Sequence, residues 1–317
     1  MTRPPTDPAA DPDPPFDADP AELAADPTGP VPDLAGARHA PPDLFDDALY
    51  ARRQAQASDP LFHRLAADEL CDRLTEVNRS FTRVLMVTHQ PGPWRQALAA
   101  HPSVERFEVV TPAPTLPIER AAFDLVVLGL WLHTCNDPLG ALIQARLALK
   151  PDGLLLAALF GGQTLHELRD ALAEAEIAET GGLSPRVAPM AEIRELGNLV
   201  QRAGLVMPVA DATRTVLRHQ TALSLMQDLR RMGETSVLAE RLRRPSRRGI
   251  FARAEAAYAA AHRGGDGRLP ATIETIWLTG WAPGPDQPEP KRPGSATARL
   301  ADALGVPERP AGDKAGT

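Results

Sequence analysis

Two unbroken apolar runs constrain the fold of this chain more than any other feature. Apart from Asp124, residues 123–128 and 154–160 lack the alternating polar positions of a strand with one solvated face. Helical patterns flank them, at Leu61–Val77 with apolar residues at helical spacing and at 138–149 with a proline in the first turn. Buried strands that alternate with helices form parallel sheets covered on both faces, so we expect an α/β fold with helices on both faces of the sheet.

The same reading applied along the chain predicts the remaining elements. We expect a helical insertion at about residues 220–269, before the last strand. Ligands of such sheets bind at the carboxyl ends of the strands, which places the site after residues 88, 110, 128 and 160. The predicted helices are 44–56, 61–77, 94–100, 138–149, 164–178, 190–203, 222–232 and 247–261; the predicted strands are 83–88, 106–110, 123–128, 154–160, 206–210, 213–218 and 271–281.

Both ends of the chain differ in composition from its middle. Residues 1–42 hold 12 prolines and 8 acidic residues against Arg3 and Arg38, and residues 283–317 are again rich in proline and glycine. Such segments bury too little apolar surface to offset the entropy lost on ordering. We therefore expect a disordered acidic tail at 1–42, a folded domain at 43–282 and a loosely held tail at 283–317.

Charge and cysteine content argue against several classes of protein. The formal net charge is −7, whereas nucleic-acid-binding domains are typically basic, so we expect no DNA partner. No apolar run approaches the roughly 18 residues of a membrane helix, and no basic-then-apolar leader opens the chain. Cys71 and Cys135 lack the spacing of a disulfide framework or a zinc site. We expect a soluble protein of the bacterial cytoplasm that holds no metal.

Several ordered motifs resemble the class I S-adenosylmethionine-dependent methyltransferases. The sequence Phe-Asp-Leu-Val-Val at 123–127 and Leu-Lys-Pro-Asp-Gly at 149–153 are typical of that superfamily. Residues 160–169, Phe-Gly-Gly-Gln-Thr-Leu-His-Glu-Leu-Arg, resemble a narrower family, that of the arginine-hydroxylase assembly factors of respiratory complex I. Further blocks of that family lie at 181–185, 196–199, 225–229, 232–234, 280–281 and 292–297. The malonyl-carrier-protein methyltransferase of the biotin pathway is a more distant relative.

The resemblance implies a Rossmann-like methyltransferase sheet, mostly parallel with its last strand antiparallel. It implies S-adenosylmethionine as cofactor and a protein substrate, an arginine of an iron–sulfur subunit of complex I. By position in the superfamily, the cofactor contacts are Thr88, His89, Gly92, Thr111 and Leu128.

The cofactor positions are also where the chain departs from the family. The family's first strand leads into a glycine-rich loop, but here Gly92 stands between Pro91 and Pro93, which have no N–H to donate. The second strand ends at Thr111 without an acidic residue for the ribose hydroxyls. The chain then reaches the next apolar strand without room for another helix and strand, so we expect a shortened first half of the sheet.

The candidate substrate side follows the two apolar strands. His133 and Asn136 match family positions and are the catalytic candidates. The substrate-binding candidates are Trp131, Gly161, Gly162, Thr164 and Arg169. Each also has a purely structural interpretation: Trp131 as core packing, Thr164 as a helix cap, Arg169 in a pair with Glu167, and His89 as an ordinary loop residue.

Three functional hypotheses stay open at this point. The first is a methyltransferase-family enzyme, either a methyltransferase or a hydroxylase, that acts on a protein arginine. The second is a methyltransferase-like pseudoenzyme that binds a complex I subunit during assembly. The third is an RNA-associated protein. Few aromatic residues stand between the arginines of its basic run, which argues against stacking on RNA bases. The basic run that motivates it also suits an acidic partner, lipid head groups or a solvated face, and it contains Arg230, Arg231, Arg241, Arg243, Arg244, Arg247, Arg248 and Arg253.

Overall fold

The computed structural model describes residues 42–285, 287 and 305, so the predicted tails lie almost wholly outside the described residues. Six strands form one sheet in the order β2-β1-β3-β4-β6-β5. The first four strands of this order pair in parallel, and β6 is antiparallel to both of its neighbours, which confirms the predicted sheet. The strands are β1 (Val84–Val87), β2 (Phe107–Val110), β3 (Phe123–Gly129), β4 (Leu149–Phe160), β5 (Val206–His219) and β6 (Leu269–Trp281).

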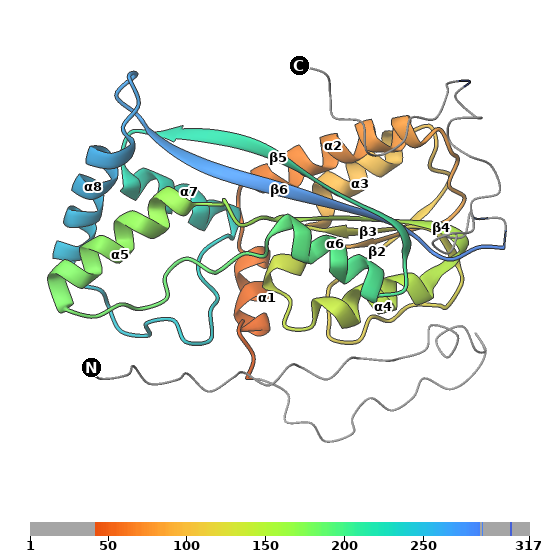
Figure 1. The fold of residues 1–317 in the computed structure, drawn as a ribbon, viewed down its shortest axis with the longest axis horizontal. Coiled ribbons are helices and arrows are strands. Elements are labelled where there is room, and N and C mark those ends of the chain that lie inside the picture. Colours follow the sequence, from red (N-terminus) through yellow and green to blue (C-terminus); the bar gives the residue numbers. More distant parts are fainter. Residues whose placement is uncertain (1–41, 286, 288–304, 306–317) are drawn as a thin grey trace, which may run out of the picture.

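Helices cover both faces of the sheet, as predicted (Figure 1). On one face, α2 and α3 pack over β1 and β3 around Leu70, Leu74 and Trp94. On the other face, α1, α4 and α6 enclose Tyr50, Leu142 and Val200. The helices are α1 (Asp47–Ala55), α2 (Leu61–Val77), α3 (Pro91–Ala100), α4 (Pro138–Ala148), α5 (His166–Thr180), α6 (Ile193–Arg202), α7 (Ala222–Met232) and α8 (Arg248–His262).

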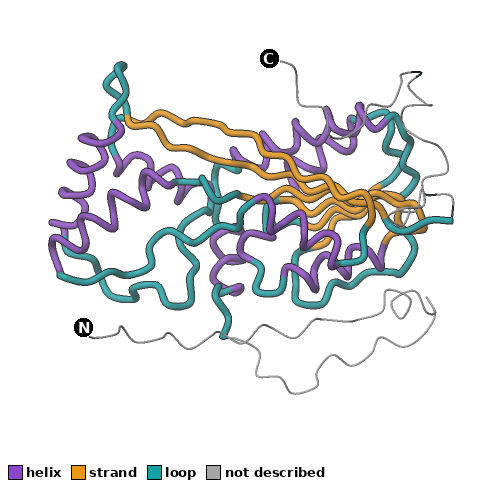
Figure 2. The backbone as a smooth tube through the Cα atoms, in the orientation of Figure 1, coloured by secondary structure: helices purple, strands orange, loops and turns teal. Residues whose placement is uncertain are grey.

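The first half of the sheet is shortened. Between β2 and β3, residues 111–122 contain neither a helix nor a strand, and β2 stands at the edge of the sheet with only four residues. The second half is extended instead. β4 pairs with β6 only from Thr275 to Trp281, so the earlier part of β6 continues with β5 as a two-stranded ribbon toward α7 and α8 (Figure 2).

Several predicted ends differ from the structure by one to three residues, and three differences have a local reason. The helix predicted at 94–100 begins at Pro91, because proline fits the first helical turn. β4 begins at Leu149 rather than Leu154, because the register with β3 shifts here and a bulge accepts Pro151 without an N–H. The strands predicted at 206–210 and 213–218 are one strand, β5, paired with β6 along its length.

Candidate functional site

A cavity of about 290 Å³ opens beyond the carboxyl ends of β3 and β4. Its walls come from parts of the chain that are distant in sequence: α1, α2, the turn after β3, the start of α5, and the insertion around α7. Most of the lining is apolar, and the polar groups are few. The lining residues that the argument uses are Tyr50, Phe62, His133, Phe160, Thr164, Arg186, Arg230 and Glu234.

Glu234 supplies the carboxylate of this cavity, and its side chain is only 10% exposed. It follows Gly233, whose left-handed backbone (φ +83°) ends α7 and turns the chain inward. Gln54 Nε2 donates to Glu234 Oε1 at 2.7 Å. The single proton of Tyr50 Oη is shared between the same oxygen at 3.4 Å and Leu130 O at 3.2 Å. Within residues 42–285, Oε2 accepts no hydrogen bond, and the ring of His133 faces it with Nε2 at 3.6 Å.

His133 lies in a short 3₁₀ turn after β3 (Leu132–Thr134), and its side chain is 2% exposed. Neither of its ring nitrogens has a hydrogen-bond partner among the described residues. Its ring lies 4.5 Å from the Phe160 ring and 6.1 Å from the Tyr50 ring, measured between centroids. Buried polar nitrogens are normally hydrogen-bonded, so this histidine is suited to a ligand in the cavity. The structure thus brings the predicted His133 to the cavity.

Asn136, the other catalytic candidate, points elsewhere. Its Oδ1 accepts from Phe45 N at 2.9 Å, and its Nδ2 donates to Phe45 O at 3.0 Å. Asn136 therefore ties down the segment that leads into α1, and α1 carries Tyr50. It does not line the cavity, and the contacts favour a positioning role.

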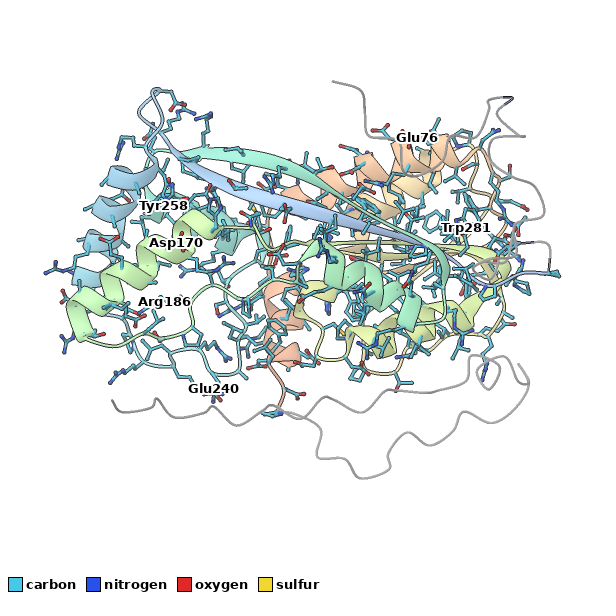
Figure 3. The ribbon with its side chains drawn as sticks, viewed as in Figure 1. Glu76, Asp170, Arg186, Glu240, Tyr258 and Trp281 are labelled. Atoms are coloured by element: carbon cyan, nitrogen blue, oxygen red, sulfur yellow. The ribbon has the colours of Figure 1, made fainter. Side chains whose placement is uncertain are left out.

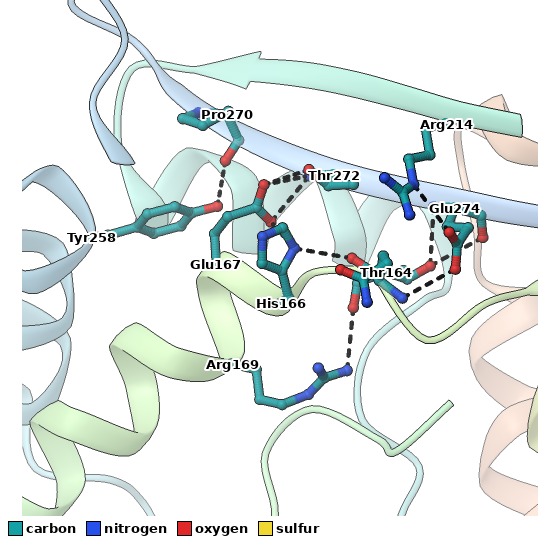
Figure 4. Close-up of polar contacts among 10 residues, drawn as sticks. Thr164, His166, Glu167, Arg169, Arg214, Tyr258, Pro270, Thr272 and Glu274 are labelled. Carbon is teal, nitrogen blue, oxygen red and sulfur yellow. Dashed lines mark hydrogen bonds and ion pairs between the residues drawn. The ribbon is translucent and has the colours of Figure 1, made fainter. Parts of the chain in front are cut away.

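The predicted substrate residues divide into those in the cavity and those beside it. Thr164 lines the cavity, exchanges hydrogen bonds with the backbone of Glu274 and accepts at its carbonyl from Arg169 (Figure 4). Thr164 does not cap α5, because Leu165 occupies the N-cap with a left-handed backbone. Arg169 pairs with backbone carbonyls rather than with Glu167, which accepts from Thr272 instead.

The predicted glycines and Trp131 lie outside the cavity lining. A Cβ on Gly161 would lie 2.5 Å from Glu274 Oε2, so this residue serves the close approach of β4 and β6. A Cβ on Gly162 would lie 2.5 Å from Glu192 Oε1. Trp131 is buried in the core between the sheet and α4. These contacts favour structural roles.

The predicted cofactor positions do not form the cradle that S-adenosylmethionine takes in the superfamily. Thr88 is buried, and its hydroxyl accepts from Gln90 N. Gly92 lies inside α3, and a Cβ there would meet nothing within 4 Å, so no backbone approach requires a glycine. Thr111 is exposed, and Leu128 is fully buried in the core. None of them lines the cavity, so we derive no step through this cofactor.

Three histidines gather near Glu234 although they are far apart in sequence. Burial lowers the pKa of His89 to about 4, and its ring packs edge-on to Tyr50 at 5.2 Å. Burial also lowers the pKa of His63 to about 4, and His63 Nδ1 accepts from Trp94 Nε1 at 3.0 Å. Both imidazoles are therefore neutral at pH 7, while His133 faces the carboxylate itself.

Sequence reasoning missed Glu234, Tyr50, Gln54 and His63. The one available signal was the family block Met232-Gly233-Glu234, where an acid follows the glycine that ends a helix. Of the residues that line the cavity, Figure 3 labels Arg186. Among the described residues there is no cluster of three potential metal ligands, and no helix of the length and hydropathy that crosses a membrane.

This chain is similar to known proteins in a family model, in solved structures and in sequence. Residues 65–157 match the model of a methyltransferase domain. Among solved structures, a methyltransferase from Bacillus halodurans is 12% identical with a TM-score of 0.43, and it covers 67% of this chain and 98% of its own. Phosphoethanolamine N-methyltransferase 2 of Haemonchus contortus, solved with S-adenosylhomocysteine, is 12% identical with a TM-score of 0.39, covering 75% and 57%.

Sequence relatives are much closer. The mitochondrial arginine-hydroxylase NDUFAF5 of Mus musculus is 38% identical over 82% of this chain and 83% of its own length. That of Danio rerio is 31% identical over 82% and 89%. The malonyl-[acyl-carrier protein] O-methyltransferase of Xylella fastidiosa is 36% identical, over 54% of this chain and 56% of its own. This chain therefore belongs to the NDUFAF5 family of the S-adenosylmethionine-dependent methyltransferase superfamily.

Proposed function

We propose that this protein receives an arginine side chain of a partner protein in the cavity beside Glu234. The partner we propose is an iron–sulfur subunit of respiratory complex I. One observation carries the proposal: a carboxylate whose side chain is only 10% exposed faces the cavity and forms no ion pair with an arginine or lysine of the described chain. A buried charge without a partner is costly, so a cationic ligand fits this place. The mitochondrial relatives are arginine hydroxylases by name, which supports the same choice.

The surroundings of Glu234 suit a guanidinium. Gln54 and Tyr50 hold Oε1 and fix the carboxylate plane, which leaves Oε2 to accept from the ligand. Burial raises the pKa of Tyr50, so its phenol stays a donor to that carboxylate. Phe160 and Phe62, in edge contact at 5.3 Å, provide aromatic surface on which a planar cation can stack. His133 can donate to or accept from a group bound beside Oε2.

The two arginines of the cavity wall do not repel this cation strongly. Arg186 is neutralised by a two-pronged pair with Glu176, with Nη2 to Oε1 at 2.8 Å and Nε to Oε2 at 2.9 Å. Arg230 is exposed, where its charge is screened by solvent. Glu234 is therefore the dominant charge inside the cavity.

The test is a calorimetric titration of the full chain with three matched peptides that carry arginine, lysine or citrulline at the centre. The proposal expects the arginine peptide to bind most tightly, because only arginine has both the charge and the planar fork of donors. Equal affinity for the three peptides contradicts it. A pull-down from cells that recovers no complex I subunit contradicts the proposed partner.

A second function, binding without turnover, is favoured by the prolines and the unneeded glycine at the start of α3. Titration with S-adenosylmethionine separates it from methyl transfer. Ligand at a hundred times its dissociation constant stabilises a fold by about 2.7 kcal/mol, which a thermal shift detects. No binding supports a pseudoenzyme that holds the partner during assembly. Binding, followed by a mass increase on the arginine peptide, contradicts it.

We also propose the cytoplasm as the place of action. Cys71 and Cys135 are both free thiols, as in proteins of reducing compartments. Burial raises the pKa of Cys135 to about 12, so that thiol stays protonated and unreactive. Fractionation of cells that express the tagged full chain tests the location; recovery in a membrane or secreted fraction contradicts it.

A further inference from the structure

An exposed group of arginines in the insertion is left without acidic partners. Residues 239–248 contain five arginines and one acid, Glu240. Arg241 pairs with Asp46 at 3.0 Å, and farther on Arg253 pairs with Glu179 at 3.0 Å. The other four are exposed and form no ion pair with any carboxylate of residues 42–285. We call these four the arginine ridge: Arg243, Arg244, Arg247 and Arg248.

The ridge lies beside the wall of the cavity. Arg186 lines the cavity, and its Nη1 donates to Ser246 Oγ at 3.0 Å, which fixes the middle of the ridge against that wall. Arg230, at the end of α7, adds another exposed cation to the cavity lining. Figure 3 shows Arg186 and Glu240 at the same end of the molecule. A chain that enters the cavity on this side therefore meets several positive charges.

The ridge also stands against the local preference of its helix. Arg247 is the N-cap of α8 and Arg248 its first residue, and no side chain caps this helix. The N-terminus of a helix carries partial positive charge and favours acids, so two cations there destabilise the free protein. A carboxylate bound at this place would offset that repulsion and accept from the free N–H groups of the first turn.

We infer that the arginine ridge binds acidic residues that flank the arginine delivered to the cavity. This inference rests on the proposed function and names the chemistry of its partner: a protein segment with a cationic side chain between acidic neighbours. Glu234 selects the centre of the segment, and the ridge selects its flanks. Each exposed pair contributes little, but several opposite charges together speed association and set the register of the segment.

The test measures binding of fluorescein-labelled arginine peptides to the full chain. One peptide has aspartate and glutamate flanks, and the other has asparagine and glutamine at the same positions. The variant reverses three charges of the ridge: Arg243→Glu, Arg244→Glu and Arg247→Glu. The matched control reverses three exposed arginines of the other half of the molecule that form no ion pair within the described chain: Arg95→Glu, Arg106→Glu and Arg120→Glu.

We expect the wild type and the control to prefer the acidic-flank peptide by roughly tenfold at low salt, and that preference to vanish in the ridge variant and at high salt. Circular dichroism of the variant reports its folding, and a folded ridge variant that keeps the preference overturns the inference. Equal binding of the two peptides by the wild type also overturns it.

Two further arms separate the competing outcomes. The first arm adds a single-stranded RNA oligonucleotide. If the wild type binds it and the ridge variant loses RNA binding but keeps its peptide preference, the ridge binds nucleic acid and the inference is overturned. In a second variant of the full chain, amides replace the eight acids of residues 1–42, which tests whether that segment competes with the peptide for the arginine ridge. If the preference for acidic flanks appears only in this variant, the ridge binds the chain's own acidic segment and the inference is overturned. Failure of Glu234→Gln to change arginine selectivity refutes the proposed function and leaves the flank preference to be measured separately.

Discussion

The two halves of this sheet end at the same edge but present different surfaces there. At the β1 and β2 half, Trp94 and Thr88 are fully buried and the helix after β1 opens with prolines. At the β3 and β4 half, a cavity opens onto Glu234 and an unpartnered His133. Both halves have the carboxyl ends of parallel strands at this edge, so the fold alone does not decide where a ligand binds. The side chains at the edge and the insertion around α7 decide it.

The first way to break this comparison is to open the packed half. Trp94 is fully buried and donates to His63, so Trp94→Ala leaves a cavity and an orphaned acceptor. We expect a loss of about 3–5 kcal/mol in the free energy of unfolding. Urea denaturation measures it. A loss below about 1 kcal/mol would show that this half tolerates an opening and is no packed core.

Acid should also weaken the packed half. The pKa values of His63 and His89 are about 4 in the folded protein, against 6.5 for free imidazole. Between these values the unfolded chain binds more protons than the folded protein. The two histidines therefore make their full contribution to the free energy of unfolding above pH 6.5, and that contribution is lost as the pH falls toward 4. Each pKa unit corresponds to about 1.4 kcal/mol, so His63 alone accounts for a loss on the order of 3 kcal/mol.

The control for that pH dependence is His63→Gln. Glutamine keeps an acceptor for Trp94 Nε1 but does not titrate. Denaturation curves between pH 7 and pH 4 should therefore show a smaller decline for the variant than for the wild type. An identical decline in both proteins would mean that His63 is not the group that resists protonation.

A pair of glycine substitutions sharpens the comparison with smaller effects. Gly161→Ala places a methyl group against Glu274 and Ile276, and we expect a loss of about 1–3 kcal/mol. Gly92→Ala meets no neighbour within 4 Å and lies in α3, so we expect a gain of up to about 1 kcal/mol. Thermal unfolding of both variants checks this. A Gly92→Ala variant that loses stability or arginine-peptide binding would restore a functional role to the loop after β1.

The sequence predicted the fold well where local signals agreed. α2 and α7 have the predicted bounds, because apolar spacing coincides with real ends: Thr221 forms a capping box and Gly233 ends α7. The mostly parallel sheet with its antiparallel last strand followed from the resemblance, and the shortened first half from the short stretch of chain between the second and third predicted strands. β4 extends beyond its prediction through Pro151, and β5 joins two predicted strands because its pairing with β6 continues through Asp211 and Ala212.

The candidate site was predicted only in part, because it is made by long-range contacts. His133 follows a buried strand and was recognisable. Glu234 is held in the cavity by Gln54 of α1, which lies 180 positions earlier in the chain. Asn136 matched a family position, yet its amide holds the backbone of Phe45. Neither the periodicity of the sequence nor the spacing of its motifs indicates such long-range contacts.

The most direct measurement of the central claim is a double-mutant cycle between the protein and its ligand. The cycle titrates wild type and Glu234→Gln with the arginine peptide and with its citrulline counterpart, and Glu240→Gln serves as the exposed control. If the guanidinium binds Glu234, the two changes couple by about 1.5–3 kcal/mol, because each alone already removes the charged hydrogen bond. Effects that add to within about 0.5 kcal/mol would contradict the account.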